Sequence, residues 1–191
     1  MDKLAVLALI VFAAVMALPF VWCTADDPEK VAEWFRALPS AKEKTTQLHF
    51  YFHDTVTGKN PTAVPIARAP STDKSPTMFG FLSMMDDPLT VGPDPNSEPV
   101  GRAQGIYGSA GQDSLGLLMT LNFMFTSKEY NGSTLSVLGR NPIFETYREM
   151  PITGGTGVFR LARGIATAKT HVFNTTSGDA IVEYKVIILH Y

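Results

Sequence analysis

The sequence contains little cysteine and no excess of basic residues. Its 191 residues include one cysteine, and 16 lysines and arginines stand against 18 acidic residues, for a formal net charge of −2. This balance leaves no basic patch for nucleic acid or for an anionic membrane. Charged residues make up only 18% and hydrophobic residues 45%, which excludes global disorder. The length fits one domain, alone or with a processing segment.

The N-terminus predicts export from the cell. An apolar run from Leu4 to Cys23 is followed by small residues, as in a secretory signal peptide that is cleaved after about Ala25. The run is long enough to make a retained membrane anchor the alternative, but Pro19 near its end favours cleavage. We therefore expect residues 1–25 to be a signal peptide and the mature protein to be secreted into the extracellular space. Loss of Cys23 would then exclude disulfides, cysteine-based metal sites and thiol catalysis.

Two N-glycosylation sequons agree with this destination. They are NGS at Asn131 and NTT at Asn174, and both fall at predicted turns, where a glycan would be exposed. A third Asn-x-Thr pattern, at Asn60, is blocked because Pro61 follows the asparagine. The sequence thus predicts glycans on Asn131 and Asn174.

Residues 26–45 are predicted to form an N-terminal extension with one short helix. Asp27 and Pro28 suit the N-cap and the first helical turn, and apolar residues then recur at helical spacing until Pro39. From about Lys42 onward no convincing helix appears, and residues 46–191 are predicted to form one β domain. Its expected strands are 46–57, 62–68, 77–85, 99–108, 115–126, 132–140, 143–150, 156–173 and 179–191.

The strand pattern predicts an all-β fold. Eight or so antiparallel strands without intervening helices suggest a closed barrel or a sandwich. The strand at 115–126 favours a barrel, because it is largely apolar on both faces. One face would fill the lumen and the other would meet a partner subunit. Pro65 places its strand at an edge or a bulge, and the proline-rich stretch from Asp86 to Pro99 is expected to be the longest loop.

One carboxylate lies on an apolar strand face. Because side chains alternate along a strand, Asp54 shares its face with Leu48, Phe50, Phe52 and Val56. Burial would raise the pKa of this carboxyl toward the range that is useful for proton transfer. The alternative is a strand end at which Asp54 reaches water or caps the following turn.

Two further polar groups face an unexpected direction. Tyr107 shares its face with Gly101 and Gly105, which predicts either concave space at a binding site or a strongly bent barrel corner. Arg148 follows a mainly apolar face and would need an anionic partner, for which Asp54 is a candidate. The alternative places Arg148 at the barrel rim with its guanidinium in water.

Other constellations predict no chemistry. His49 and His53 lie on one strand face, but neither they nor the other histidines show metal-ligand spacing, so no metal is expected. The glycine-rich segment at 153–157 lacks the lysine and the following helix of a phosphate-binding loop, so it is predicted to be a turn. No serine stands in a nucleophile-elbow context.

Several blocks of the sequence together resemble the plant dirigent proteins. They appear in order and with the spacing of that family from about Leu48 to Tyr191. The blocks are FYFHD from 50 to 54, VGRAQGIY from 100 to 107, RE at 148–149, TGGTG from 153 to 157 and ARG from 162 to 164. The resemblance implies an eight-stranded antiparallel β-barrel like that of allene oxide cyclase, a homo-oligomer (dimer or trimer), N-glycosylation and an apoplastic location. It also implies no cofactor and no oxidative centre, since a separate oxidase or laccase would generate the phenoxy radicals.

The resemblance also implies roles for particular residues. Asp54 and Arg148 match the family residues that act on quinone methide intermediates, and Tyr107 matches a residue that lines the cavity. Asn141 stands where members that form pinoresinol usually carry an aspartate, which sets this chain apart from classic lignan formation. It looks instead like the branch of pterocarpan synthases and of proteins that couple gossypol-type phenols. In that branch Asp87 is expected to line the pocket.

Three functions follow as hypotheses from these residues and this resemblance. The first is a guide that binds phenolic radicals or quinone methides and makes phenoxy-radical coupling stereoselective, as in lignan and phenylpropanoid metabolism. The second is a dehydratase or cyclase of the pterocarpan type that acts on isoflavanols through a quinone methide, with Asp54 as its acid and base. The third is a cell-wall binding protein that serves in defence.

Overall fold

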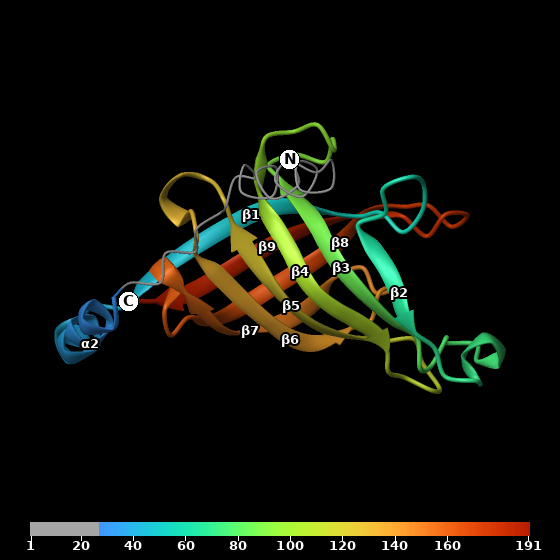
Figure 1. The fold of residues 1–191 in the computed structure, drawn as a ribbon, viewed down its shortest axis with the longest axis horizontal. Helices are drawn as coiled ribbons and strands as arrows, with labels where there is room; N and C mark the ends of the chain where they lie inside the picture. Colours follow the sequence, from blue (N-terminus) through green and yellow to red (C-terminus); the bar gives the residue numbers. More distant parts are fainter. Residues whose placement is uncertain (1–26) are drawn as a thin grey trace, which may run out of the picture.

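The computed structural model describes residues 27–191, so the predicted signal peptide lies outside the described residues. The predicted N-terminal helix is present as α2 (Pro28–Ala37), followed by the short 3-10 turn η1 (Leu38–Ser40). The Asp27 carboxylate caps α2 by accepting the Glu29 N–H at 2.9 Å. The helix projects from one end of the sheet, beside the C-terminus (Figure 1). No helix within residues 27–191 is both long and apolar enough to cross a membrane.

The remainder of the described chain is an antiparallel sheet. Its strands are β1 (Lys44–Asp54), β2 (Ala63–Ala67), β3 (Leu82–Thr90), β4 (Pro99–Ser109), β5 (Leu117–Phe125), β6 (Thr134–Asn141), β7 (Arg148–Thr156), β8 (Arg163–Phe173) and β9 (Ala180–His190). Eight of them close into a barrel in the order β1-β9-β8-β7-β6-β5-β4-β3, because β3 also pairs with β1, while β2 extends β3 at an edge (Figure 1). The predicted eight-stranded barrel is confirmed, and the sandwich alternative is wrong.

The barrel closes over a short seam. β1 pairs with β9 over eleven residue pairs, from Lys44↔His190 to Asp54↔Ala180. On its other side β1 pairs with β3 only at Tyr51↔Thr90 and Phe52↔Leu89. Further along β3, its edge is taken by β2 rather than by β1. The end of β1 therefore lies where the ladder between β1 and β3 has already stopped.

The strands around β3 confirm one local prediction and contradict another. Pro65 does lie in an edge strand with a register shift beside it, as predicted. The expected loop from Asp86 to Pro99 is wrong in its first part, because β3 continues to Thr90. The Asp86 N–H bonds the Thr62 carbonyl on the edge away from β4, and Pro88, two residues later, presents its nitrogen to that same edge. A proline can occupy the strand there because no ladder bond is required of it.

The end of the lumen nearer α2 is packed solid with aromatic rings. Phe50 meets Phe123 edge to face at a centroid distance of 5.0 Å and stacks on Tyr184 at 5.8 Å. Phe125 and Phe159 continue this packing, 5.7 Å apart. As predicted for the strand at 115–126, the alternate residues that begin at Met119 are buried in the core. This aromatic plug fills the end of the lumen nearer α2, and the cavity described below lies at the opposite end.

The outer face of the barrel carries exposed apolar side chains. Met84, Leu118 and Leu138 are 46%, 46% and 51% exposed on neighbouring or nearby strands. The strand at 115–126 was predicted to be covered on both faces. Its lumen face is buried in the core, whereas its outer face is exposed in the single chain. The expected homo-oligomer stays a prediction.

The glycines of β4 accommodate the bend of the barrel. A Cβ atom on Gly105 would overlap the Thr120 carbonyl oxygen and lie 2.6 Å from the Leu121 Cα, and one on Gly101 would overlap the Met124 carbonyl oxygen. Both glycines therefore allow β4 and β5 to approach closely. This close packing fits the bent-corner interpretation, and Tyr107 also lines the cavity described below, as the binding-site interpretation expects.

Candidate active site

The end of the lumen opposite α2 contains a cavity of about 760 Å³. Its walls combine a few polar groups with a mainly apolar surface, as ligand sites usually do. The polar groups include Asp54, Tyr107, Asn141 and Arg148, and the apolar walls include Phe52, Leu117, Met119 and Val182. Phe144 and Phe173 also line the cavity while being 76% and 45% exposed, so they lie at its mouth. Four of the residues singled out in the sequence are thus brought into one cavity.

Asp54 is the last residue of β1 and points inward, after Phe50 and Phe52 on the same face. Its Oδ1 atom is buried and has no hydrogen-bond partner. Burial raises the pKa of this carboxyl to about 6, against the lowering effect of a hydrogen bond with the Tyr107 hydroxyl. Asp54 is therefore poised to exchange a proton near neutral pH. Asp54 is thus a strand-end residue that is partly exposed, as the alternative expected, but it lines the cavity instead of capping the following turn.

Asp87 is buried behind Asp54. The seam pairs Phe52 with Leu89, and two residues further along each strand the same register brings Asp54 opposite Asp87. Asp87 is 0% exposed, both of its carboxyl oxygens lack a hydrogen-bond partner, and it is not among the residues that line the cavity. Burial, and then the charge of Asp54, raise the pKa of Asp87 to about 8. Two such carboxyls share one proton near neutral pH, because burial and the charge of Asp54 outweigh the Thr62 hydroxyl and the charge of Arg102, which favour the ionised form of Asp87.

Tyr107 connects this acid pair to the cavity. It lies in β4 opposite Ser83 of β3, and its hydroxyl interacts with both Ser83 and Asp54. Burial, together with the nearby Asp54, raises the pKa of the phenol. Tyr107 therefore stays protonated and can donate a hydrogen bond toward Asp54 or toward a bound phenolic oxygen.

Arg148 is buried without a carboxylate. It is 3% exposed, and its Nη1 donates to the Thr170 hydroxyl at 2.6 Å and to the Glu145 carbonyl at 3.4 Å. Its Nε has no partner, and no ion pair joins it to any acidic residue within residues 27–191. The expected pairing with Asp54 is therefore wrong, and so is the alternative of a rim residue in water. Burial lowers the pKa of this guanidinium, which faces the cavity with neutral partners only.

Asn141 and Tyr184 complete the polar lining. The Asn141 side chain is 5% exposed and its Oδ1 has no partner, so it can accept a hydrogen bond from a guest. Tyr184, which the sequence analysis did not single out, is fully buried between the aromatic plug and the cavity. Its phenol has a pKa raised by burial and feels the charges of Arg148, Asp54 and Asp87. The alternation of Val182, Tyr184 and Val186 along β9 marks its inward face but does not distinguish it from a core tyrosine.

The remaining predicted residues lie elsewhere on the molecule. Asn131 and Asn174, the two sequon asparagines, are both exposed in turns between strands. His53 is buried and pairs with the Thr90 hydroxyl at 2.7 Å, while His49 pairs with Glu183 on the outer face. Residues 27–191 hold no group of three or more histidine, cysteine or acidic side chains that could bind a metal ion.

The comparisons with known proteins agree with one another. The family model described as dirigent-like protein matches residues 45–189. Dirigent protein 21 of Arabidopsis thaliana is 57% identical over 148 residues, which cover 78% of each chain. Pterocarpan synthase 1 of Glycyrrhiza echinata is 53% identical over 151 residues, covering 78% of this chain and 80% of the relative. The solved structure of a pterocarpan synthase dirigent protein superposes with a TM-score of 0.74 and 52% identity, over 79% of this chain and 87% of that one. The chain therefore belongs to the dirigent family.

Proposed function

We propose that this protein removes water from a phenolic benzylic alcohol and closes a ring through a quinone methide, in the manner of a pterocarpan synthase acting on an isoflavanol. The observation that carries the proposal is the division of charge around the cavity. A carboxyl pair that holds one proton, Asp54 and Asp87, lies at the seam. Arg148 lines the same cavity and has no countercharge of its own. The mainly apolar walls suit an uncharged aromatic guest.

The proton balance of this reaction matches the groups present. The protonated carboxyl pair donates to the benzylic hydroxyl, the C–O bond breaks, and water leaves. The phenol that is conjugated with this carbon releases its proton to solvent, which yields a neutral quinone methide. A second phenolic hydroxyl then attacks the methide carbon and gives its proton to the carboxyl pair, while the quinone oxygen takes a proton back from solvent. Water is the only species lost, so no oxidant is required.

Arg148 would act where negative charge develops. As the first phenol loses its proton, its oxygen becomes partly anionic, and a guanidinium that is already desolvated stabilises this charge more strongly than water does. Tyr107 would orient the same guest by donating a hydrogen bond from a phenol that stays protonated. In this elimination the Asp54–Asp87 pair would protonate the leaving hydroxyl, and Arg148 would stabilise the phenolic oxygen that becomes anionic.

A second candidate function is stereoselective phenoxy-radical coupling. It is favoured by the relatives named as dirigent proteins and by a cavity whose acid pair could also close the quinone methides that follow coupling. This reading requires a separate oxidase or laccase to supply the radicals. It differs from the first in one measurable respect, because no product forms without an oxidant.

The decisive assay incubates the purified protein with isoflavanols in the absence of any oxidant and follows pterocarpan formation by chiral chromatography. Turnover is expected, and Asp54→Asn should abolish it. Asp86→Asn is the matched control, since Asp86 lies on the opposite face of β3 with an exposed side chain that pairs with Arg102. Product that appears only when laccase is added would instead establish the coupling function. Unaltered turnover in Asp54→Asn would remove the acid pair from the mechanism.

A further inference from the structure

The segment that follows Asp54 is fastened to the turn between β8 and β9. The Asp179 Oδ1 accepts the Val56 N–H at 2.8 Å and the Thr57 N–H at 3.3 Å. The Thr57 hydroxyl donates to Asp179 Oδ2 at 3.1 Å, and the Ser177 hydroxyl donates to the same atom at 2.7 Å. One carboxylate thus joins two chain segments that lie more than a hundred residues apart.

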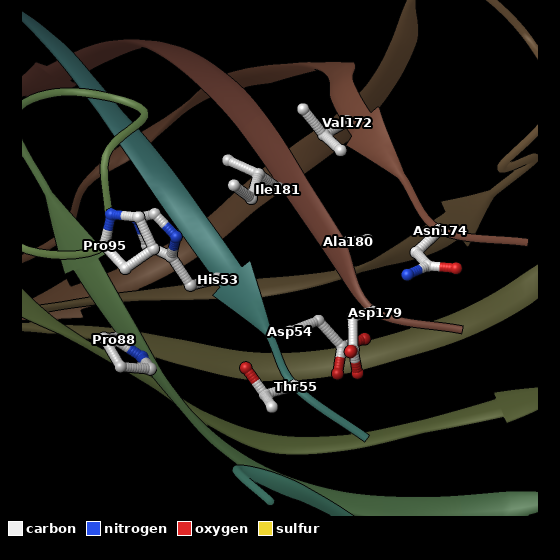
Figure 2. Close-up of a pocket in the computed structure, with 10 residues that line it drawn as sticks. All are labelled: His53, Asp54, Thr55, Pro88, Pro95, Val172, Asn174, Asp179, Ala180 and Ile181. Atoms are coloured by element: carbon white, nitrogen blue, oxygen red, sulfur yellow. The ribbon is translucent and has the colours of Figure 1, made fainter. Parts of the chain in front are cut away.

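This connection lies at the point where β1 loses its other partners. The β1–β9 ladder ends at Asp54↔Ala180, and the β1–β3 ladder ends before it, at Phe52↔Leu89. Figure 2 shows the Asp54 and Asp179 side chains next to each other at the adjoining ends of β1 and β9, beside a hollow of about 350 Å³ that both residues line. On the other side, the backbone just beyond Asp54 is held by hydrogen bonds between Thr55 and Thr62 and between Thr55 and Ala63, and none of these reaches Val56 or Thr57.

We propose that Asp179 is a positioning residue for the reaction, because it fixes the end of β1 so that the Asp54 carboxyl faces the cavity and because it adds a permanent negative charge beside that carboxyl. This proposal rests on the proposed function. Asp179 is not among the residues that line the larger cavity, so it would act through Asp54. A displacement of about 1 Å in a reacting group can lower the rate roughly a hundredfold, so hydrogen bonds that hold Asp54 in place should affect kcat.

The charge of Asp179 acts in the same direction as its position. Its hydrogen bonds, the one from Ser177 first, lower the pKa of Asp179, so it stays ionised at neutral pH. The charged and titratable groups that act on Asp54 or feel its charge are Tyr107 from β4, Asp87 from β3, Tyr184 from β9 and Asp179 from the turn before β9. Of these, Asp179 opposes ionisation of Asp54, and the charge of Asp54 in turn opposes ionisation of Asp87, so both effects help the pair to keep its proton.

Two substitutions separate the positional effect from the charge effect. Asp179→Asn keeps an oxygen that can accept the Val56 N–H but removes the charge. We expect the pH at which activity declines toward the basic side to move down, with KM unchanged and the plateau kcat within about threefold. Asp179→Ala removes the fastening as well. We expect kcat to fall roughly tenfold to a hundredfold at every pH, with a smaller change in KM.

The matched control is Asp27→Asn. Asp27 also accepts a backbone N–H, from Glu29 at 2.9 Å, but it lies beside α2 at the far end of the barrel. Its substitution removes the same charge and should leave the pH profile unchanged. Because Asp179 is partly exposed, 0.5 M salt should shrink the difference between wild type and Asp179→Asn by screening.

A second measurement stands apart from activity. Carbon-13 NMR of the labelled Asp54 carboxyl gives its titration midpoint in wild type, Asp27→Asn and Asp179→Asn. A midpoint that falls only in Asp179→Asn supports the proposal even if the chosen isoflavanol is not a substrate, a result that would count against the proposed function alone. Equal midpoints in all three proteins, or wild-type kcat in a folded Asp179→Ala, would overturn the proposal.

Discussion

Replacing Asp87 with asparagine should make the protein more stable at neutral and basic pH. The change keeps the shape of the side chain but removes a carboxyl that is 0% exposed and lacks hydrogen-bond partners at both oxygens. In the folded protein this carboxyl has a pKa of about 8, against 3.8 for the unperturbed group. Between these values the folded state holds a proton that the unfolded state has released. Wild-type stability therefore falls as pH rises from about 4 to about 8, and the asparagine variant lacks this contribution.

The magnitude follows from this difference in protonation. One proton corresponds to about 1.4 kcal/mol for each pH unit. From pH 6 to pH 8 the difference in unfolding free energy between Asp87→Asn and wild type should therefore grow by up to about 3 kcal/mol. The pKa of Asp54, about 6, places most of its own contribution below this interval. Histidine titrations are common to both proteins and cancel in the difference.

Urea unfolding at a series of pH values measures this difference directly. Asp113→Asn provides the control, since this exposed carboxylate between β4 and β5 is not among the groups that act on Asp87 and its curve should be parallel to that of wild type. If the curves of Asp87→Asn and wild type are also parallel, Asp87 is not a buried acid with a raised pKa. The proton-sharing pair would then have to be abandoned. The variant should also lose activity, since Asp54 would no longer share its proton with a second carboxyl.

Three further substitutions test other parts of the structure. Arg148→Gln should lower kcat by roughly a hundredfold or more in steady-state assays while the circular dichroism spectrum is kept, because it removes the desolvated cation of the cavity. Gly105→Ala should cost about 3 kcal/mol or more in urea unfolding, because the added Cβ would overlap the Thr120 carbonyl oxygen. Phe50→Ala should cost about 3–5 kcal/mol, because the ring is buried against Tyr184; a loss below 1 kcal/mol would contradict a solid aromatic plug.

Strand alternation was sufficient to predict which side chains enter the lumen, but not what they meet there. Phe50 and Phe52 fix the inward face of β1, and Asp54 follows from them without further information. For Arg148 the inward face was also correct, yet its expected partner was wrong. Alternation along one strand says nothing about distance across a barrel. The partners of Arg148 are Thr170 and the Glu145 carbonyl, contributed by the neighbouring strand and by the segment before β7.

The environment of Asp87 could not be predicted in the same way. Pro88 suggested a loop, so no face could be assigned to its neighbour. The strand continues because the nitrogen of Pro88 lies on an edge that needs no ladder bond, and this depends on where β1 and β2 end relative to β3. Such a dependence is tertiary in origin. Only the resemblance to other dirigent proteins drew attention to Asp87, and its burial behind Asp54 came from the structure.

The short ladder between β1 and β3 has a consequence for where the barrel opens locally. Two residue pairs close this side of the barrel, whereas eleven hold β1 to β9. Transient separation of the strands should therefore begin between β1 and β3. Backbone N–H groups of β3 that point toward β1 should exchange their hydrogen faster than those that point toward β4. The two acids lie beside that edge, so brief hydration there would allow their shared proton to equilibrate with solvent while a guest stays bound.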